Sequence, residues 1–195
     1  MKLLKTLLAS AVAVSAMPAL AYEAGDIIVK AGVVNVNPKE DNIDLGAAGK
    51  AQISDDTQLG LTLTYMVAPQ VGVEVLAATP FKHDVTLNGN KIASTKHLPP
   101  TVSAQYYLMD PASKLQPYVG LGVNHTFFFD EDGAATHLKK SWGLAYSAGL
   151  NYNIDDKMLA NVAVWKMDID SELNDTGIDI EIDPLVFMVG AGMKF

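Results

Sequence analysis

Residues 57–82 read TQLGLTLTYMVAPQVGVEVLAATPFK. From Leu59 to Tyr65 every second residue is aliphatic or aromatic, and the residues between them are glycine or threonine. Side chains of a β-strand point alternately to its two faces, so this period of two predicts strands at 57–66 and 71–82, joined by a short turn at 67–70. Each strand has one apolar face and one small or polar face.

The same alternation recurs in six further segments of about 10 residues, the length at which a tilted strand crosses a membrane. These segments are 26–36, 99–108, 116–128, 141–152, 158–168 and 184–195. The last one ends on Phe195, as does the C-terminal strand that outer-membrane assembly machinery recognises. We therefore predict an all-β fold, an eight-stranded antiparallel transmembrane β-barrel.

The predicted connections alternate between short and long. Short ones lie at 67–70, 109–115 and 153–157, and long ones, rich in Asp, Asn, Gly and Lys, lie at 37–56, 83–98, 129–140 and 169–183. Outer-membrane barrels have short periplasmic turns and longer extracellular loops. An even number of strands then predicts that both termini lie in the periplasm.

A soluble lipocalin-like barrel or β-sandwich is the main alternative fold. Such a protein turns its apolar face inward and its polar face toward water. Here one face of the strands is aliphatic and aromatic, while the other is filled with Gly, Ala, Ser, Thr and Asn. The small face suits a narrow lumen, so the membrane barrel is favoured.

The N-terminus has the pattern of an export signal. Lys2 and Lys5 precede an apolar stretch from Leu7 to Ala16, and Ala19-Leu20-Ala21 forms an A-x-A cleavage site. The stretch is shorter than the roughly 20 residues of a membrane-spanning helix. We predict a cleaved signal peptide at 1–21 and a single barrel domain at 22–195, located in the bacterial outer membrane.

The charge composition excludes nucleic acid as a partner. The net charge is −8, and all 14 cationic residues are lysines, so the chain lacks the arginine forks that bind phosphate. There is no cysteine to form a disulfide. We also predict no cofactor and no metal site.

Specific motifs resemble those of the OmpW family, which includes the AlkL alkane-uptake proteins. The motifs are EAGD at 23–26, DTQLGLT at 56–62, GVEVLAATPF at 72–81, LPPT at 98–101, PYVGLGVN at 117–124, VWKMDID at 164–170 and DP at 183–184. The resemblance implies passive uptake of small hydrophobic molecules through an apolar channel, which is closed toward the periplasm and has a lateral exit through the barrel wall. It also implies channel positions at Leu76 and Trp165. Lys166 departs from the pattern, which has an aromatic residue there.

The alternation predicts what lines the lumen. Small inward residues such as Gly60 and Gly149 leave space in a barrel that side chains could otherwise fill. Farther from the periplasmic end the inward face becomes apolar. We predict a ligand channel there, lined by Leu76, Phe128, Trp165, Met167, Val186 and Met188. The alternative is that these side chains simply pack the lumen.

Two further features are predicted along the barrel axis. Inward charges near the periplasmic turns predict a plug formed by Asp26, Lys30, Glu74 and Lys194.

A turn near 88–90 places an inward Pro80 opposite Pro99 or Thr101, with Phe81 outward. Proline cannot donate to a β-ladder, so Pro80, Pro99 and Pro100 predict a lateral gate. The alternative is an ordinary bulge beside a loop.

Several other functions remain open at this point. A structural or receptor barrel for phages or bacteriocins would have a filled lumen, and a narrow pore for small polar solutes would need a wet path past Glu74 and Lys194. An enzyme is not predicted, because His125 and Ser141 on neighbouring strands do not make a catalytic triad. Expected partners are small hydrophobic ligands, outer-membrane lipid, lipopolysaccharide and the barrel assembly machinery, and the chain is expected to be a monomer.

Overall fold

The computed structural model describes residues 21–39, 43–44, 49–133, 138–173 and 178–195. The predicted signal peptide therefore lies outside the described residues except for Ala21, whose carbonyl accepts a hydrogen bond from Lys194 Nζ at 2.6 Å. In the part of the chain that the structure describes, no helix is long and apolar enough to cross a membrane.

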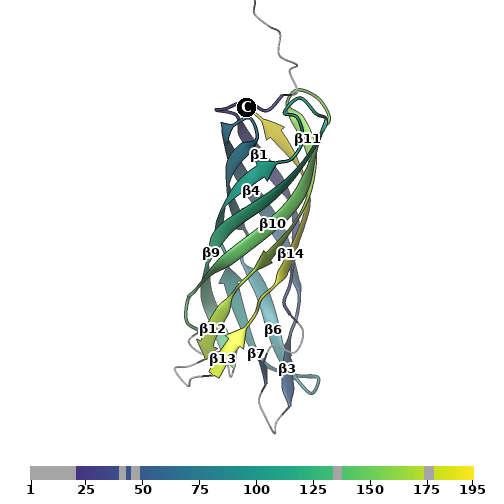
Figure 1. Cartoon of the computed structure of the whole chain (residues 1–195). Helices are drawn as coiled ribbons and strands as arrows, with labels where there is room; N and C mark the ends of the chain where they lie inside the picture. Colours follow the sequence, from purple (N-terminus) through teal and green to yellow (C-terminus); the bar gives the residue numbers. More distant parts are fainter. Residues whose placement is uncertain (1–20, 40–42, 45–48, 134–137, 174–177) are drawn as a thin grey trace, which may run out of the picture.

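Eight long antiparallel strands close into a tilted barrel (Figure 1). They are β1 (Ile27–Asn37), β4 (Asp56–Ala68), β5 (Val71–Ala78), β8 (Thr101–Tyr107), β9 (Leu115–Gly133), β10 (Ser141–Asn153), β11 (Met158–Met167) and β14 (Leu185–Lys194). This is also their order around the barrel, and β14 pairs with β1 to close the ring. Closure satisfies the backbone groups between strands, which is the condition for strands to cross a bilayer.

The sequence-based prediction of the fold is confirmed, with two corrections to strand ends. All eight predicted strands occur in the predicted order. However, β9 continues to Gly133 instead of ending at 128, and the predicted strand at 71–82 stops at Ala78. Both corrections concern the same end of the barrel, opposite the C-terminus (Figure 1).

The two faces of the barrel wall differ as the alternation predicts. On β4, Leu59 and Leu61 are 67% and 51% exposed, whereas Thr62 between Leu61 and Leu63 is 1% exposed. Other strands expose side chains of the same apolar kind, among them Val33, Val75, Val102, Leu121, Tyr146, Val162, Phe187 and Val189. This outer surface matches the apolar band that lipid chains cover in outer-membrane barrels.

Beyond the ring, shorter strands extend the wall at what we call the hairpin end (Figure 1). They are β2 (Ile43–Asp44), β3 (Lys50–Ile53), β6 (Phe81–Leu87), β7 (Asn90–Leu98), β12 (Asp170–Leu173) and β13 (Ile178–Glu181). β6 and β7 form a hairpin around Asn88 and Gly89, whose φ values of 51° and 80° suit a type I′ turn. β7 pairs with the extended part of β9, while β12 and β13 form a separate hairpin.

These hairpins replace much of what the sequence predicts as long loops. In β6 and β7 the buried alternating set includes His83, Thr95 and His97 beside Phe81 and Val85. Because polar residues occupy inward positions there, the period of two does not show as an alternation of apolar and polar residues. We call the opposite end of the barrel, which carries Phe195, the terminal end.

Candidate functional site

Two ion pairs lie inside the barrel near its terminal end. Lys30 Nζ on β1 is 2.7 Å from Glu74 Oε2 on β5, and both side chains are fully buried. Thr64 donates its hydroxyl to the same carboxylate oxygen at 3.2 Å. Lys194 Nζ lies 3.7 Å from a carboxylate oxygen of Asp26. The structure thus brings together the four residues of the predicted plug, as two pairs of balanced charge.

Three tyrosines surround these ion pairs. The ring of Tyr22 meets that of Tyr107 edge-on at 5.2 Å, and Tyr107 packs against Tyr118 at 5.3 Å. Lys30 Nζ lies 5.0 Å from the centre of the Tyr118 ring. All three rings are buried, so they pack the interior of the barrel at this level.

An amide network completes this layer. Asn151 Nδ2 donates to the Tyr22 hydroxyl at 3.0 Å, and Asn161 Nδ2 donates to Asn151 Oδ1 at 2.7 Å. The sequence does not predict the three tyrosines and the two asparagines as parts of the plug. For Tyr107, Tyr118, Asn151 and Asn161 the inward strand position was a usable signal, because residues larger than Ala or Ser are less common on that face. Tyr22 precedes β1 and gives no such signal.

The inward glycines make room for neighbouring side chains instead of leaving the lumen empty. A Cβ atom added to Gly149 would lie 2.3 Å from Tyr118 Cζ, and one added to Gly60 would lie 2.2 Å from Val34 Cγ2. The expectation that these two glycines supply open space is therefore wrong.

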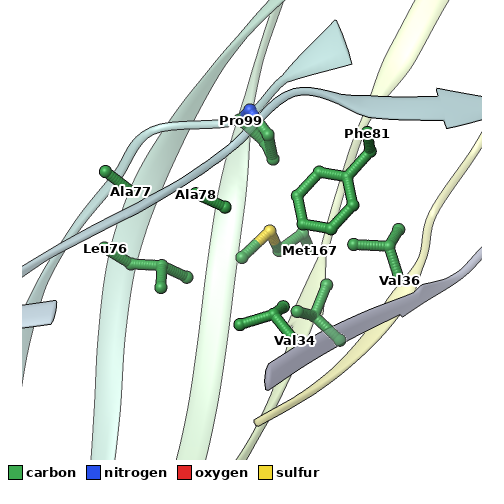
Figure 2. A pocket seen from close by; sticks show the side chains of 9 residues that line it. Val34, Val36, Leu76, Ala77, Ala78, Phe81, Pro99 and Met167 are labelled. Atoms are coloured by element: carbon green, nitrogen blue, oxygen red, sulfur yellow. The ribbon is translucent and has the colours of Figure 1, made fainter. Parts of the chain in front are cut away.

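An apolar cavity of about 10 Å³ lies farther toward the hairpin end (Figure 2). Its lining is Val34, Val36, Leu76, Ala77, Ala78, Phe81, Pro99, Met167 and Val186. Figure 2 shows Phe81, Met167 and Leu76 pointing toward one another from different parts of the wall. The volume is that of about one water-sized probe, so side chains fill most of this level.

The cavity gathers only part of the predicted ligand channel. Leu76, Met167 and Val186 line it. Trp165 and Met188 are buried at 1% exposure but do not line it, and Phe128 lies farther out, with its ring 6.0 Å from that of His97. The Nε1 atom of Trp165 is buried and has no hydrogen-bond partner among the described residues.

The backbone ladder between β5 and β8 is interrupted beside this cavity, at what we call the seam. Pairing of β5 with β8 stops at Leu76 and Thr101, and pairing resumes between Phe81 and His97 on the hairpin. Thr79, Pro80, Pro99 and Pro100 lie in the gap.

Both outer sides of the seam remain hydrogen-bonded to the rest of the wall. The Thr79 N–H donates to the Leu59 carbonyl at 2.9 Å, and the His125 N–H donates to the Pro100 carbonyl at 3.0 Å. The interruption is therefore confined to the junction of β5 with β8.

The structure corrects two orientations predicted at the seam. Thr79 and Pro80 are both exposed, so one extra residue shifts the alternation and turns Phe81 inward, where it is 1% exposed. Pro80 accordingly does not face the lumen. Pro99 is buried and lines the cavity, while Pro100 is half-buried. A bulge of this kind reverses the face of every following residue, which a strict period of two does not anticipate.

Other residues singled out in the sequence take simple structural roles. Lys166 Nζ bonds to the carbonyl of Asp183 at the hairpin end. His125 Nδ1 faces the Ser141 carbonyl at 3.1 Å, whereas the Ser141 hydroxyl accepts a bond from the Asp170 N–H. The two side chains therefore do not form a nucleophile and base. The described residues contain no group of three His, Asp or Glu placed to hold a metal ion.

Comparison with known proteins places these features in one family. The OmpW family model matches residues 23–195. The chain is 42% identical to outer membrane protein W of Escherichia coli, over 98% of this chain and 100% of that protein. It is 28% identical to outer membrane protein AlkL of Ectopseudomonas oleovorans, over 89% and 84% of the two chains.

A solved structure agrees with the architecture. The crystal structure of the outer membrane protein OprG from Pseudomonas aeruginosa superimposes with a TM-score of 0.78 at 43% identity, covering 90% of this chain and 98% of that one. The chain belongs to the OmpW family, and it is an eight-stranded β-barrel of the outer membrane.

Proposed function

We propose that this barrel admits small hydrophobic molecules at the hairpin end, holds them in the apolar cavity and releases them sideways through the seam into the lipid. One observation carries the proposal. The cavity is lined by Ala78, which faces inward, and also by Ala77, which pairs with the outward Leu61 on β4. Pro99, on the other side of the seam, lines it as well. The cavity therefore extends to the part of the wall where the ladder is interrupted.

The plug supports an exit through the wall over an exit through the axis. An apolar molecule moving straight to the periplasm would have to displace the buried Lys30–Glu74 pair, and separating two buried charges is costly. On the cavity side of the seam the lining residues Ala77, Ala78 and Pro99 are apolar, so the ligand meets no charged side chain there. Prolines at 80, 99 and 100 donate no backbone hydrogen bond, which lowers the cost of widening this junction.

Passage requires the cavity to enlarge, because about 10 Å³ is too small for any organic molecule. Met167 and Leu76 are flexible side chains that can change rotamer, and Phe81 follows directly after the bulge at Thr79 and Pro80. We assign the opening to these three residues. The competing function is that of a receptor barrel, in which side chains fill the lumen permanently.

Uptake of an apolar probe by cells that express equal amounts of each barrel tests the proposal. Ala78→Trp fills the cavity, and Ala104→Trp places the same ring on the exposed outer face of β8 as a control. The proposal expects the wild type and Ala104→Trp to accelerate uptake and Ala78→Trp to abolish the gain. If cells with the wild-type barrel take up the probe no faster than cells without it, the receptor barrel is the better assignment.

The seam has its own test. Pro99→Ala with Pro100→Ala restores two backbone donors at the gap, and Pro117→Ala restores one on β9 where that strand pairs with Leu150, far from the gap. We expect the first variant to slow uptake and the second to leave it unchanged. Equal uptake by both variants would remove the lateral route while leaving an apolar cavity.

A further inference from the structure

Two histidine rings lie stacked in the hairpin just outside the cavity. His83 on β6 and His97 on β7 have ring centres 4.8 Å apart and planes inclined by 10°. Their exposed fractions are 2% and 1%. Histidines in extracellular loops are ordinarily hydrated, so a buried pair of imidazoles needs a structural or functional cause.

Most of the ring nitrogens in this pair have no hydrogen-bond partner among the described residues. His83 Nδ1 bonds to the Ser54 carbonyl, which can only accept, so Nδ1 carries the proton and Nε2 is left as an acceptor. His83 Nε2 and both nitrogens of His97 are buried and unpartnered. Leaving such groups unsatisfied costs about 1–3 kcal/mol each, which a ligand with matching polar groups would recover.

The pair adjoins the apolar cavity directly. Phe81, which lines the cavity, has its ring 5.6 Å from that of His97, and it shares the inward face of β6 with His83. Pro99, another lining residue, follows His97 by two positions on the same face. A molecule in the cavity that extended toward the hairpin end would meet these rings first.

The chemistry of the pair selects an uncharged polar group. Burial lowers the pKa of His83 and lowers that of His97 to about 3, so both rings are neutral at physiological pH. Together they offer two acceptors and one donor. A hydroxyl group can use one acceptor and one donor at once, whereas the two neutral rings supply no countercharge to a carboxylate or an ammonium group.

We propose that His83 and His97 form a polar subsite that binds the hydroxyl group of a small uncharged amphiphile, such as a primary alcohol, while its alkyl chain lies in the apolar cavity. This inference rests on the proposed function, because it assumes that the cavity receives ligands. It adds that the preferred ligand carries one polar end and is not a pure hydrocarbon.

To test the subsite, the rate at which cells take up a medium-chain primary alcohol is compared with the rate for the alkane of the same chain length. His97→Phe keeps an aromatic ring between Phe81 and Phe128 but removes both nitrogens, and His125→Phe makes the same change outside the lumen. We expect His97→Phe to slow alcohol uptake roughly fivefold, the equivalent of one neutral hydrogen bond, and to leave alkane uptake unchanged. His125→Phe should change neither.

A second measurement does not depend on the variant folding. Nitrogen NMR spectra of the imidazoles are recorded for the wild-type barrel in lipid nanodiscs, with and without each probe. The alcohol should shift the His83 and His97 resonances and the alkane should not. Absence of a shift with the alcohol, or an equal loss of alcohol and alkane uptake in His97→Phe, overturns the subsite and leaves the proposed function standing. If the wild-type barrel accelerates the uptake of neither probe, both the proposed function and the subsite are overturned.

Discussion

Lys30 and Glu74 lie 2.7 Å apart inside the barrel, on strands β1 and β5 that are separated by β4, and neither side chain is exposed. The pair therefore passes over the inner face of β4 instead of bridging neighbouring strands. With Tyr118 packed on the lysine, it fills part of the lumen at the terminal end, where the sequence predicts a plug. In the proposed function, this closure is the reason why an apolar molecule leaves through the wall and not along the axis.

Breaking this pair should destabilise the barrel strongly. Glu74→Gln leaves the Lys30 ammonium group buried without a carboxylate, which costs roughly 3–5 kcal/mol. The double variant Lys30→Met with Glu74→Leu removes both charges and should recover most of the loss. The free energy of unfolding in urea, measured in lipid vesicles, checks both expectations.

A surface pair provides the control. Lys39 and Glu181 are 3.2 Å apart but 55% and 60% exposed, so Glu181→Gln should cost at most about 1 kcal/mol. If Glu74→Gln were no more costly than Glu181→Gln, water would have to reach the interior pair, and the plug would not be closed.

Close packing around the plug leads to a second prediction. A methyl group at Gly149 would meet the Tyr118 ring at 2.3–2.7 Å, so Gly149→Ala should lower stability by about 1–3 kcal/mol. Ala160→Val on the exposed face of β11 adds volume without such a contact and should be nearly neutral. The urea midpoints of the two variants are compared, and similar midpoints would mean that Tyr118 has room to move.

The sequence predicts the barrel well because each wall strand obeys one local rule. From Leu59 to Tyr65 the alternation assigns every side chain to its face. Outward side chains contact lipid and must be apolar, so the same alternation holds along the whole strand. The site depends on departures from it. The extra residue at Thr79 and Pro80 turns Phe81 into the cavity, and a bulge has no signature in a period of two.

The parts of the site that the sequence does not predict depend on contacts between distant strands. The stacking of His83 on His97 needs the register of the β6–β7 hairpin, which begins at a bulge. Tyr22 joins the plug through Asn151, which is remote in the chain and carries no motif. The four plug charges could be predicted because all of them are inward, but which lysine pairs with which carboxylate follows only from the barrel geometry.

Acidification should loosen the β6–β7 hairpin. The pKa of His97 falls to about 3 in the folded chain because of burial, against about 6.5 when unfolded. Between these values the unfolded hairpin binds more protons, so its stability is full above pH 6.5 and decreases as the pH falls toward 3. The neighbouring His83 has a lowered pKa too and adds to the effect, while the Asp56 carboxylate opposes it.

Hydrogen exchange at pH 7.5 and pH 5 measures this loosening. After correction for intrinsic exchange, amides of β6 and β7 should lose protection at the lower pH, and those of β1 and β14 should not. His97→Phe should reduce the difference between the two pH values. Equal protection of the wild-type hairpin at both values would mean that the rings stay neutral at no cost to folding.

The tyrosine layer predicts that the wild-type barrel does not conduct ions. Tyr107 and Tyr118 are buried at 0% and 1% exposure beside the Lys30–Glu74 pair, so we expect no continuous path of water along the axis. Replacing both tyrosines by alanine should open a path and produce single-channel currents in a planar bilayer. Tyr106→Ala, on the exposed face of β8, should remain silent. Steady conductance through the wild type would instead favour a narrow pore for polar solutes, since ions can cross only where water is continuous from one side to the other.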